Sequence, residues 1–184
     1  MRLKCIDSRA LAFVRKFIVP LPAEATLLQK FGFMHLSPGF LLPAFEYLKD
    51  KVSGMIENEN LVTLSFDEMK IDERSDYDYK LDAQLGPHSY AQQLFVRSLI
   101  GKWRLPIFTE FDVAMSKETL ISIIQQLEEI NVHVLLVICD QGTPNQSLSK
   151  QLGITTEKVY FEIEGIQRKI FFAPDVVHLV KSLR

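Results

Sequence analysis

The chain has 184 residues, of which 47% are hydrophobic and 24% are charged, and its formal net charge at pH 7 is −2. This composition is typical of a globular protein and excludes a disordered or collagen-like chain. The slightly acidic balance excludes the overall basic surface expected of a self-sufficient DNA-binding module. No apolar run approaches the roughly 20 residues that a membrane helix needs, so no membrane contact is expected.

Residues 1–58 are predicted to form a helical prelude. Two segments, LPAEATLLQKFG and PGFLLPAFEYLKDKVSGMI, carry apolar residues at helical spacing. Prolines and a Pro-Gly pair separate these segments from each other. The prelude is expected to lead into a sheet that begins near residue 59.

Residues 59–184 are predicted to form an α/β domain that opens with three strands. These strands are expected at 61–67, about 75–82 and about 90–99, with short polar connections that allow antiparallel pairing. The second of them, SDYDYKLDAQLG, alternates apolar and polar residues as a half-exposed strand does. A helix over MSKETLISIIQQLEEI follows, for which Ser116 is the predicted N-cap.

The last third of the chain is predicted to alternate strands and helices. The continuous apolar run VHVLLVICD is typical of a strand buried on both faces. A helix is expected next, with Thr143 as its N-cap and Gly153 at its end. A hairpin turning at Glu164–Gly165 and a helix opening near Pro174 complete the domain. Three strands followed by helix, strand, helix, strand and helix is the order of the RNase H-like (retroviral integrase superfamily) fold, a mixed sheet with flanking helices.

Two aspartates follow predicted strands. Asp67 ends the first strand in LVTLSFDEMK, and Asp140 ends the buried fourth strand just before a helix. In open α/β sheets, active sites collect at the carboxyl ends of strands. If the two strands are neighbours, both carboxylates point into one crevice. Their oxygens are hard ligands that suit Mg²⁺ or Mn²⁺.

The two aspartates and the run before Asp67 also have other interpretations. An apolar strand that ends at an acid is often a plain transition from strand to loop. The run VTLSFDE also imitates the Walker B strand of nucleotide-hydrolysing enzymes, but the required GxxxxGK[ST] loop is absent from the sequence. Glu68 alternates to the opposite face from Asp67, so we do not expect it to bind a metal directly. Ordinary structural roles are predicted for the isolated histidines His35, His88 and His133. Cys139 is expected to be a small buried hydrophobe, and Trp103 is expected to anchor the core.

Three sequence blocks carry a family resemblance. FDEMKI (66–71), ICDQGTPNQSLSKQLGI (138–154) and FFAPDVVHLVKSLR (171–184) resemble three successive blocks of P-element-type DNA transposases, the group that includes the THAP-domain transposases. GKWRLPIFTEF is similar to the Lys-Trp-x-x-Pro segment of that family. The resemblance implies an RNase H-like core that cuts DNA and transfers strands with two Mg²⁺ or Mn²⁺ ions in the nucleus. It implies that Asp67 and Asp140 are the first two catalytic acids and metal ligands.

The resemblance also implies parts that these residues do not contain. In such transposases the third acid is a glutamate far downstream, beyond an inserted domain through which GTP would bind. The zinc-coordinating THAP module is not encoded here. The last block usually reads Asp-x-Pro-His, whereas this chain keeps Asp175 and His178 but has Val177 in place of the proline. The sequence stops inside a predicted helix, which is expected to mark a fragment boundary.

The leading functional hypothesis is therefore the N-terminal part of a transposase catalytic domain that is weakly active or inactive alone. Its partner in the full-length protein would be transposon-end DNA, and homo-oligomerisation is left open. The alternative is a catalytically silent, domesticated descendant retained as a binding or interaction protein. A third option is a stand-alone RNase H-like nuclease in which Glu68 or Asp175 supplies the missing ligand.

Overall fold

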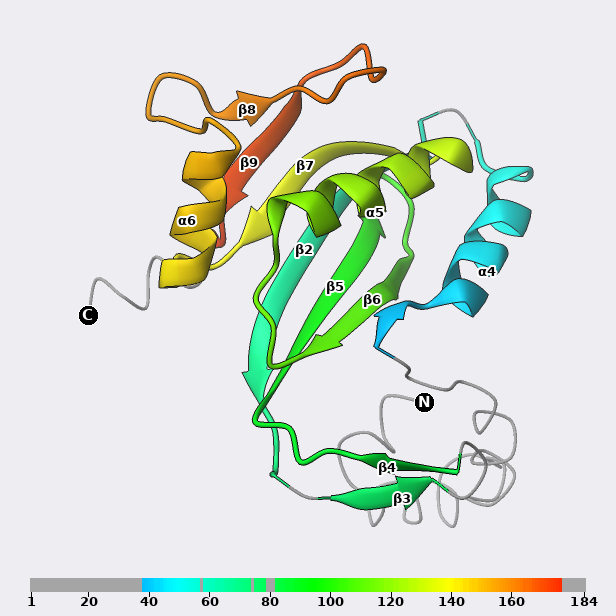
Figure 1. Ribbon diagram of the computed structural model, residues 1–184. Coiled ribbons are helices and arrows are strands. Elements are labelled where there is room, and N and C mark those ends of the chain that lie inside the picture. The colour runs from blue at the N-terminus through cyan, green and yellow to red at the C-terminus, as the bar shows by residue number, and fades with distance from the viewer. Residues whose placement is uncertain (1–37, 57, 74, 79–81, 177–184) are drawn as a thin grey trace, which may run out of the picture. The chain divides into compact units, whose positions relative to one another are not determined.

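A seven-stranded mixed sheet forms the centre of the computed structural model (Figure 1). The structure describes residues 38–56, 58–73, 75–78 and 82–176, so the first predicted prelude helix lies outside the described residues. Across the sheet the strands run in the order β1 (Gly39–Phe40), β6 (Arg104–Phe111), β5 (Tyr90–Ser98), β2 (Leu61–Lys70), β7 (His133–Cys139), β9 (Ile170–Pro174) and β8 (Tyr160–Phe161).

The antiparallel half of the sheet is a meander of β2, β5 and β6. β2 pairs with β5 over nearly its whole length, and β5 pairs in turn with β6. The predicted strands near 61–67 and 90–99 are therefore confirmed. Val62, Leu64 and Phe66 of β2 are buried and belong to the core, whereas Ser65 and Asp67 face the opposite side. The alternation gives the sheet one core face and one open face at this point.

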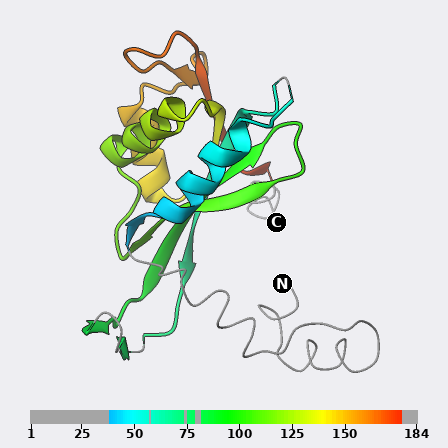
Figure 2. The ribbon, with the colours of Figure 1, turned by 90° about the vertical axis from the view of Figure 1, so that its right-hand side faces the viewer.

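One strand of the predicted meander is wrong. The segment at about 75–82 does not join the main sheet, because β3 (Asp76–Asp78) pairs only with β4 (Ala83–Leu85) in a separate two-stranded sheet. This hairpin lies beyond the ends of β2 and β5 (Figure 2). The third meander strand is Arg104–Phe111 instead, a segment for which no strand was predicted.

The parallel half of the sheet is built on β7. β7 runs parallel to β2 on one side and to β9 on the other, and β8 pairs antiparallel with β9. The prediction that this strand is buried on both faces is wrong: Val134, Val137 and Cys139 are buried, whereas Leu135, Leu136 and Ile138 are only partly buried. The predicted hairpin is confirmed, with Gly165 in its connection at a φ of +86°.

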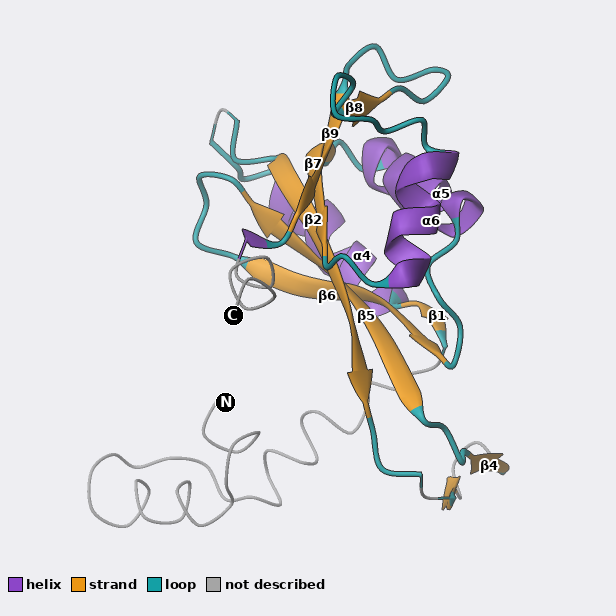
Figure 3. Cartoon of the chain, turned by 90° about the vertical axis from the view of Figure 1, so that its left-hand side faces the viewer, coloured by secondary structure: helices purple, strands orange, loops and turns teal. Residues whose placement is uncertain are grey.

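Three helices pack with the sheet: α4 (Leu42–Val52), α5 (Lys117–Glu129) and α6 (Thr143–Gln151). Figure 3 shows α5 and α6 on the same side of the sheet. Their apolar faces and the core face of the strands share one hydrophobic core. The largest fully buried side chains are Leu48, Leu64, Leu94, Ile107, Leu120, Ile123, Ile124, Leu127, Leu148, Ile170, Val62 and Val96. Because α4 contributes Leu48 to this core, the second helix of the predicted prelude packs with the sheet; the division at residue 58 itself stays a prediction.

The helix ends follow local chemistry. The Ser116 Oγ accepts a hydrogen bond from the Thr119 N–H at 3.1 Å, as predicted for the N-cap of α5. The N-cap of α6 is Gly142 rather than the predicted Thr143, because the Gly142 carbonyl already accepts the Gln146 N–H at 3.0 Å. None of the helices in the described ranges is both long and apolar enough to cross a membrane.

Candidate active site

The strand register brings Asp67 and Asp140 to the same level of the sheet. Ser65 on β2 is the partner of Ile138 on β7, and the two strands are parallel. Each aspartate follows its paired residue by two positions, so both lie at the carboxyl end of this pairing. Neighbouring strands are about 4.8 Å apart, and residues at equal positions of parallel strands point to the same face. The predicted adjacency of the two strands is correct.

Asp175 lies in the same row. Cys139 of β7 is the partner of Pro174 of β9, so Asp140 and Asp175 each follow by one position. The Asp175 N–H donates a hydrogen bond to the Cys139 carbonyl at 2.7 Å, which holds this level of the two strands together. Asp175 was predicted as a candidate third ligand of a stand-alone nuclease, and it lines the same pocket as Asp67 and Asp140. His178 lies outside the described residues.

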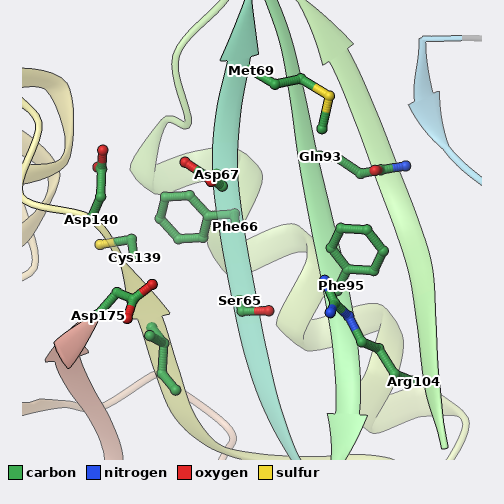
Figure 4. A pocket seen from close by; sticks show the side chains of 11 residues that line it. Ser65, Phe66, Asp67, Met69, Gln93, Phe95, Arg104, Cys139, Asp140 and Asp175 are labelled. Atoms are coloured by element: carbon green, nitrogen blue, oxygen red, sulfur yellow. The ribbon is translucent and has the colours of Figure 1, made fainter. Parts of the chain in front are cut away.

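All three aspartates line one groove of about 410 Å³, within the usual range of ligand sites. Figure 4 shows their carboxylates projecting from three neighbouring elements, with Arg104 and Phe95 along the same groove. The lining residues are Ser65, Phe66, Asp67, Met69, Gln93, Phe95, Arg104, Ile138, Cys139, Asp140 and Asp175. We call this surface the acid groove. Glu68 is not among its lining residues, in agreement with its predicted opposite orientation.

Asp140 is held by the turn that starts α6. Its Oδ1 accepts a hydrogen bond from the Gly142 N–H at 3.1 Å and another from the Asn145 side-chain amide. Gly142 is required by close approach, since a Cβ built there would lie 3.2 Å from Oδ1 and 3.6 Å from Oδ2 of Asp140. The half-buried Asp140 carboxylate is therefore fixed by donors that all act on one oxygen. Gly142 and Asn145 were not predicted as site residues, since in the sequence they belong only to the start of a predicted helix.

Asp67 is more exposed and less restrained. Its Oδ1 accepts a hydrogen bond from the Glu68 N–H at 2.9 Å. The prediction that Asp67 ends its strand is wrong, because β2 continues to Lys70 and stays paired with β5, where Gln93 is the partner of Asp67. The carboxylate thus stands on a rigid strand rather than on a loop, and solvent reaches it directly.

The Cys139 thiol is buried and unreactive. Its side chain is only 2% exposed and belongs to the core. Burial, together with the adjacent Asp140 charge as the smaller cause, raises the pKa of the thiol to about 12. A thiol with so high a pKa remains protonated at neutral pH and does not act as a nucleophile. The predicted role as a small buried hydrophobe is confirmed.

Two of the histidines with predicted structural roles, His88 and His133, form contacts away from the acid groove. The His88 ring stacks on Phe111 and its Nδ1 lies 2.9 Å from Asp112 Oδ2. The His133 Nδ1 lies 2.8 Å from Glu128 Oε2. Neither histidine lines the acid groove. His35 lies outside the described residues.

Trp103 and Arg104, neighbours in the sequence, have different roles. Trp103 packs against the core, as predicted. Arg104 enters the acid groove, and its guanidinium carbon lies 3.9 Å from the centroid of the Phe95 ring. Arg104 was not predicted as a site residue. The missing signal was β6 itself, because without that strand nothing placed Arg104 beside Phe95.

The donor set suits a hard divalent cation. Carboxylate oxygens are the ligands that Mg²⁺ and Mn²⁺ prefer. Among the described residues, however, no group of three or more His, Cys, Asp or Glu side chains is arranged closely enough to hold a metal ion. Asp67 and Asp140 therefore fit part of a coordination shell, and metal binding by this pair stays a prediction.

The order of the sheet, its mixed strand directions and the two aspartates carried by adjacent parallel strands define an RNase H-like domain. Residues 36–153 match the family described as TNP-like, RNase H N-terminal domain, and the chain belongs to this family.

Two relatives extend this assignment. The chain is 32% identical over 166 residues to the Transposable element P transposase of Drosophila melanogaster, an alignment that covers 90% of this chain and 22% of that protein. Among solved structures it is similar to the Drosophila P element transposase strand transfer complex, with a TM-score of 0.77 and 30% identity. That alignment covers 99% of this chain and 42% of the solved one. The chain thus spans about a fifth of the curated relative and less than half of the solved chain.

Proposed function

We propose that this chain supplies two carboxylates of a transposase catalytic centre that cleaves DNA strands and transfers them. One observation carries the proposal: Asp67 and Asp140 follow paired residues of adjacent parallel strands and line the same groove. Family membership and the similarity to a P element strand transfer complex support the same reaction class. Plain strand ends would not need to meet in one groove.

In this proposal Asp67 and Asp140 hold Mg²⁺ or Mn²⁺. Such ions activate a water or a DNA 3′-hydroxyl and stabilise the leaving oxygen of an in-line displacement. The protein contributes rigid placement: Asp67 from a strand paired on both sides and Asp140 from a hydrogen-bonded turn. The two hydrogen bonds to Oδ1 of Asp140 restrain the rotation of the carboxylate, so its position does not have to be organised when the ion binds.

The partner in this proposal is DNA, with transposon ends as the substrate of the full-length protein and the nucleus as its place of action. A third acid would come from elsewhere in a longer protein, and any GTP would bind to a separate domain. The 184-residue chain alone is therefore expected to cleave DNA weakly or not at all. Strong Mg²⁺-dependent nicking by this chain, lost in Asp67→Ala, would show that two acids with local help suffice.

Calorimetric titration with Mn²⁺ tests the metal site directly. The unchanged chain should bind the ion, and Asp67→Asn or Asp140→Asn should weaken binding about tenfold or more, because each removes a charged ligand. Asp50→Asn, which alters an exposed position on α4, is the matched control and should have no effect. Absence of Mn²⁺ binding, or equal binding by all variants, would contradict the proposal. It would favour the alternative of a catalytically silent binding protein.

A further inference from the structure

Two arginines face each other across neighbouring strands. Arg97 on β5 is the direct partner of Arg104 on β6. Like charges directly opposite each other in an antiparallel pair are destabilising, so a folded chain usually separates them or neutralises them with an acid. Both side chains are exposed, and within the described part of the chain neither forms an ion pair. This arrangement has a cost in the free protein that a bound anion would remove.

The arginine pair shares a face with the candidate acids. Residues at alternate positions of β5 point to the same side, so Arg97 lies on the side of Phe95 and Gln93, both of which line the acid groove. Arg104 lines the groove itself. A DNA strand that contacts the carboxylates can therefore continue along this face of the sheet to the two arginines.

The spacing along β2 relates the arginines to the acids. Phe95 is the partner of Ser65, and Arg97 is the partner of Thr63, so these rows lie two and four residues before Asp67. At about 3.3 Å per residue, the rows are about 7 and 13 Å from the acid row. A DNA strand winds around the duplex axis as it rises about 3.4 Å per nucleotide, so consecutive phosphates are about 7 Å apart and these distances correspond to about one and two nucleotides.

Arg104 is also held in place before any ligand arrives. Its guanidinium lies over the Phe95 ring with 3.9 Å between the guanidinium carbon and the ring centroid. Stacking of this kind restrains the planar fork, so that less conformational freedom is lost when it donates hydrogen bonds to a phosphate. Arginine binds phosphate with two parallel hydrogen bonds, which a lysine cannot do.

We propose that Arg97 and Arg104, with Phe95 as the platform for Arg104, form a binding site for DNA backbone phosphates one to two nucleotides from the phosphate at the acid pair. The site's place along the DNA rests on the proposed function, but its affinity for DNA does not require metal or cleavage. Its role is to orient the strand across the groove. It carries no information about base sequence, since it contacts only the backbone.

The test is DNA binding in EDTA, measured by fluorescence anisotropy with a labelled duplex of about 20 base pairs. Arg97→Gln/Arg104→Gln should weaken binding about tenfold at low salt, because two charge-assisted phosphate contacts are lost. It should also reduce the slope of log K against log salt concentration by about 1.8, roughly 0.9 for each contact. Arg104→Lys should keep the slope and lose part of the affinity, since the charge stays and the stacked fork is lost.

Lys49→Gln/Lys51→Gln is the matched control, because it removes two positive charges from α4. It should leave the slope unchanged. An equal loss in this control would mean that net charge alone governs binding and would overturn the proposal, as would an unchanged slope in the arginine variant. Failure of the unchanged chain to bind DNA at low salt would overturn it as well. Circular dichroism verifies that each variant is folded; these side chains are exposed, so the fold should survive.

The outcome separates this site from the metal site. If the arginine variant loses DNA but retains Mn²⁺ binding, both proposals stand. If Asp67→Asn/Asp140→Asn retains DNA binding in EDTA and the unchanged chain binds no Mn²⁺, the phosphate site stands without the catalytic one. If the variant loses an acidic peptide as strongly as it loses DNA, the pair is a general anion site and the assignment to DNA fails.

Discussion

Gly142→Ala offers a sharp test of how the α6 turn supports Asp140. The backbone at Gly142 has a φ of −56°, which alanine adopts without strain, so the effect of the substitution lies in the added methyl group. That methyl would lie 3.2 Å from Oδ1 of Asp140, whereas ordinary contacts begin at 3.4 Å. The carboxylate must therefore move by about 0.2 Å or more, which equals the tolerance expected of a metal–ligand distance.

We expect Gly142→Ala to weaken Mn²⁺ binding about tenfold, or about 1.4 kcal/mol, in line with other changes to groups that orient metal ligands. The free energy of unfolding should change by less than about 1 kcal/mol, because the entropic gain of Gly→Ala opposes the poorer N-cap. Titration calorimetry and urea unfolding measure the two quantities. Gly54→Ala is the control, since its Cβ would meet only the Lys51 carbonyl at 3.8 Å. Binding by Gly142→Ala within about twofold of the unchanged chain would refute the reasoning.

Four further predictions concern stability and reactivity. Ser116→Ala should lower the free energy of unfolding by about 1 kcal/mol through loss of the α5 N-cap, measured by urea unfolding, and no loss would contradict that role. Leu127→Ala should cost about 2–5 kcal/mol by the same assay because Leu127 is fully buried, whereas the half-exposed Leu99→Ala should cost far less. Cys139 should resist alkylation at pH 8 until the chain is unfolded in urea, and rapid labelling of the native chain would contradict its burial. Since its pKa is raised from 9.0 to about 12, its contribution to stability is fully present below pH 9 and should be lost as the pH rises from about 9 to 12, an effect that Cys139→Ala should abolish.

Periodicity identified most elements of the sheet, but it could not assign strands to sheets. The alternation in SDYDYKLDAQLG correctly indicates extended, half-exposed backbone, yet it contains no information on the partner strand. The structure divides this segment into a small hairpin around Asp82, which has a φ of +49°. Partner choice depends on contacts far away in the sequence, and local alternation does not report them.

β6 was missed because Pro106 interrupts it. Proline has no N–H to donate and is normally confined to edges and bulges of sheets. Pro106 lies where the β5–β6 register shifts, and the short β1 pairs only with Phe108 and Thr109. The proline is therefore tolerated where a long, regular central strand would exclude it. Because of this proline, no strand was predicted for the segment that carries Arg104.

For the candidate site, the sequence predicted the adjacency of the two aspartates but not the residues that support them. Asp67 and Asp140 follow long apolar runs, and the rule that sites form at the carboxyl ends of strands placed them together. The supporting residues Gly142 and Asn145 act through one hydrogen-bonded turn, and Arg104 acts through a cation–aromatic contact. Such contacts depend on side-chain geometry, for which a linear sequence gives no spacing rule.

The parallel pairing of β2 with β7 has a kinetic consequence. The two strands are separated in the chain by β3, β4, β5, β6 and α5, so their pairing closes a long loop, and pairings of this kind form slowly. Local hairpins and helices can form earlier without bringing Asp67 near Asp140. If Asp67 and Asp140 bind a divalent ion as proposed, stopped-flow refolding would show ion binding only in the slowest phase. Ion binding would then report the completion of the central sheet.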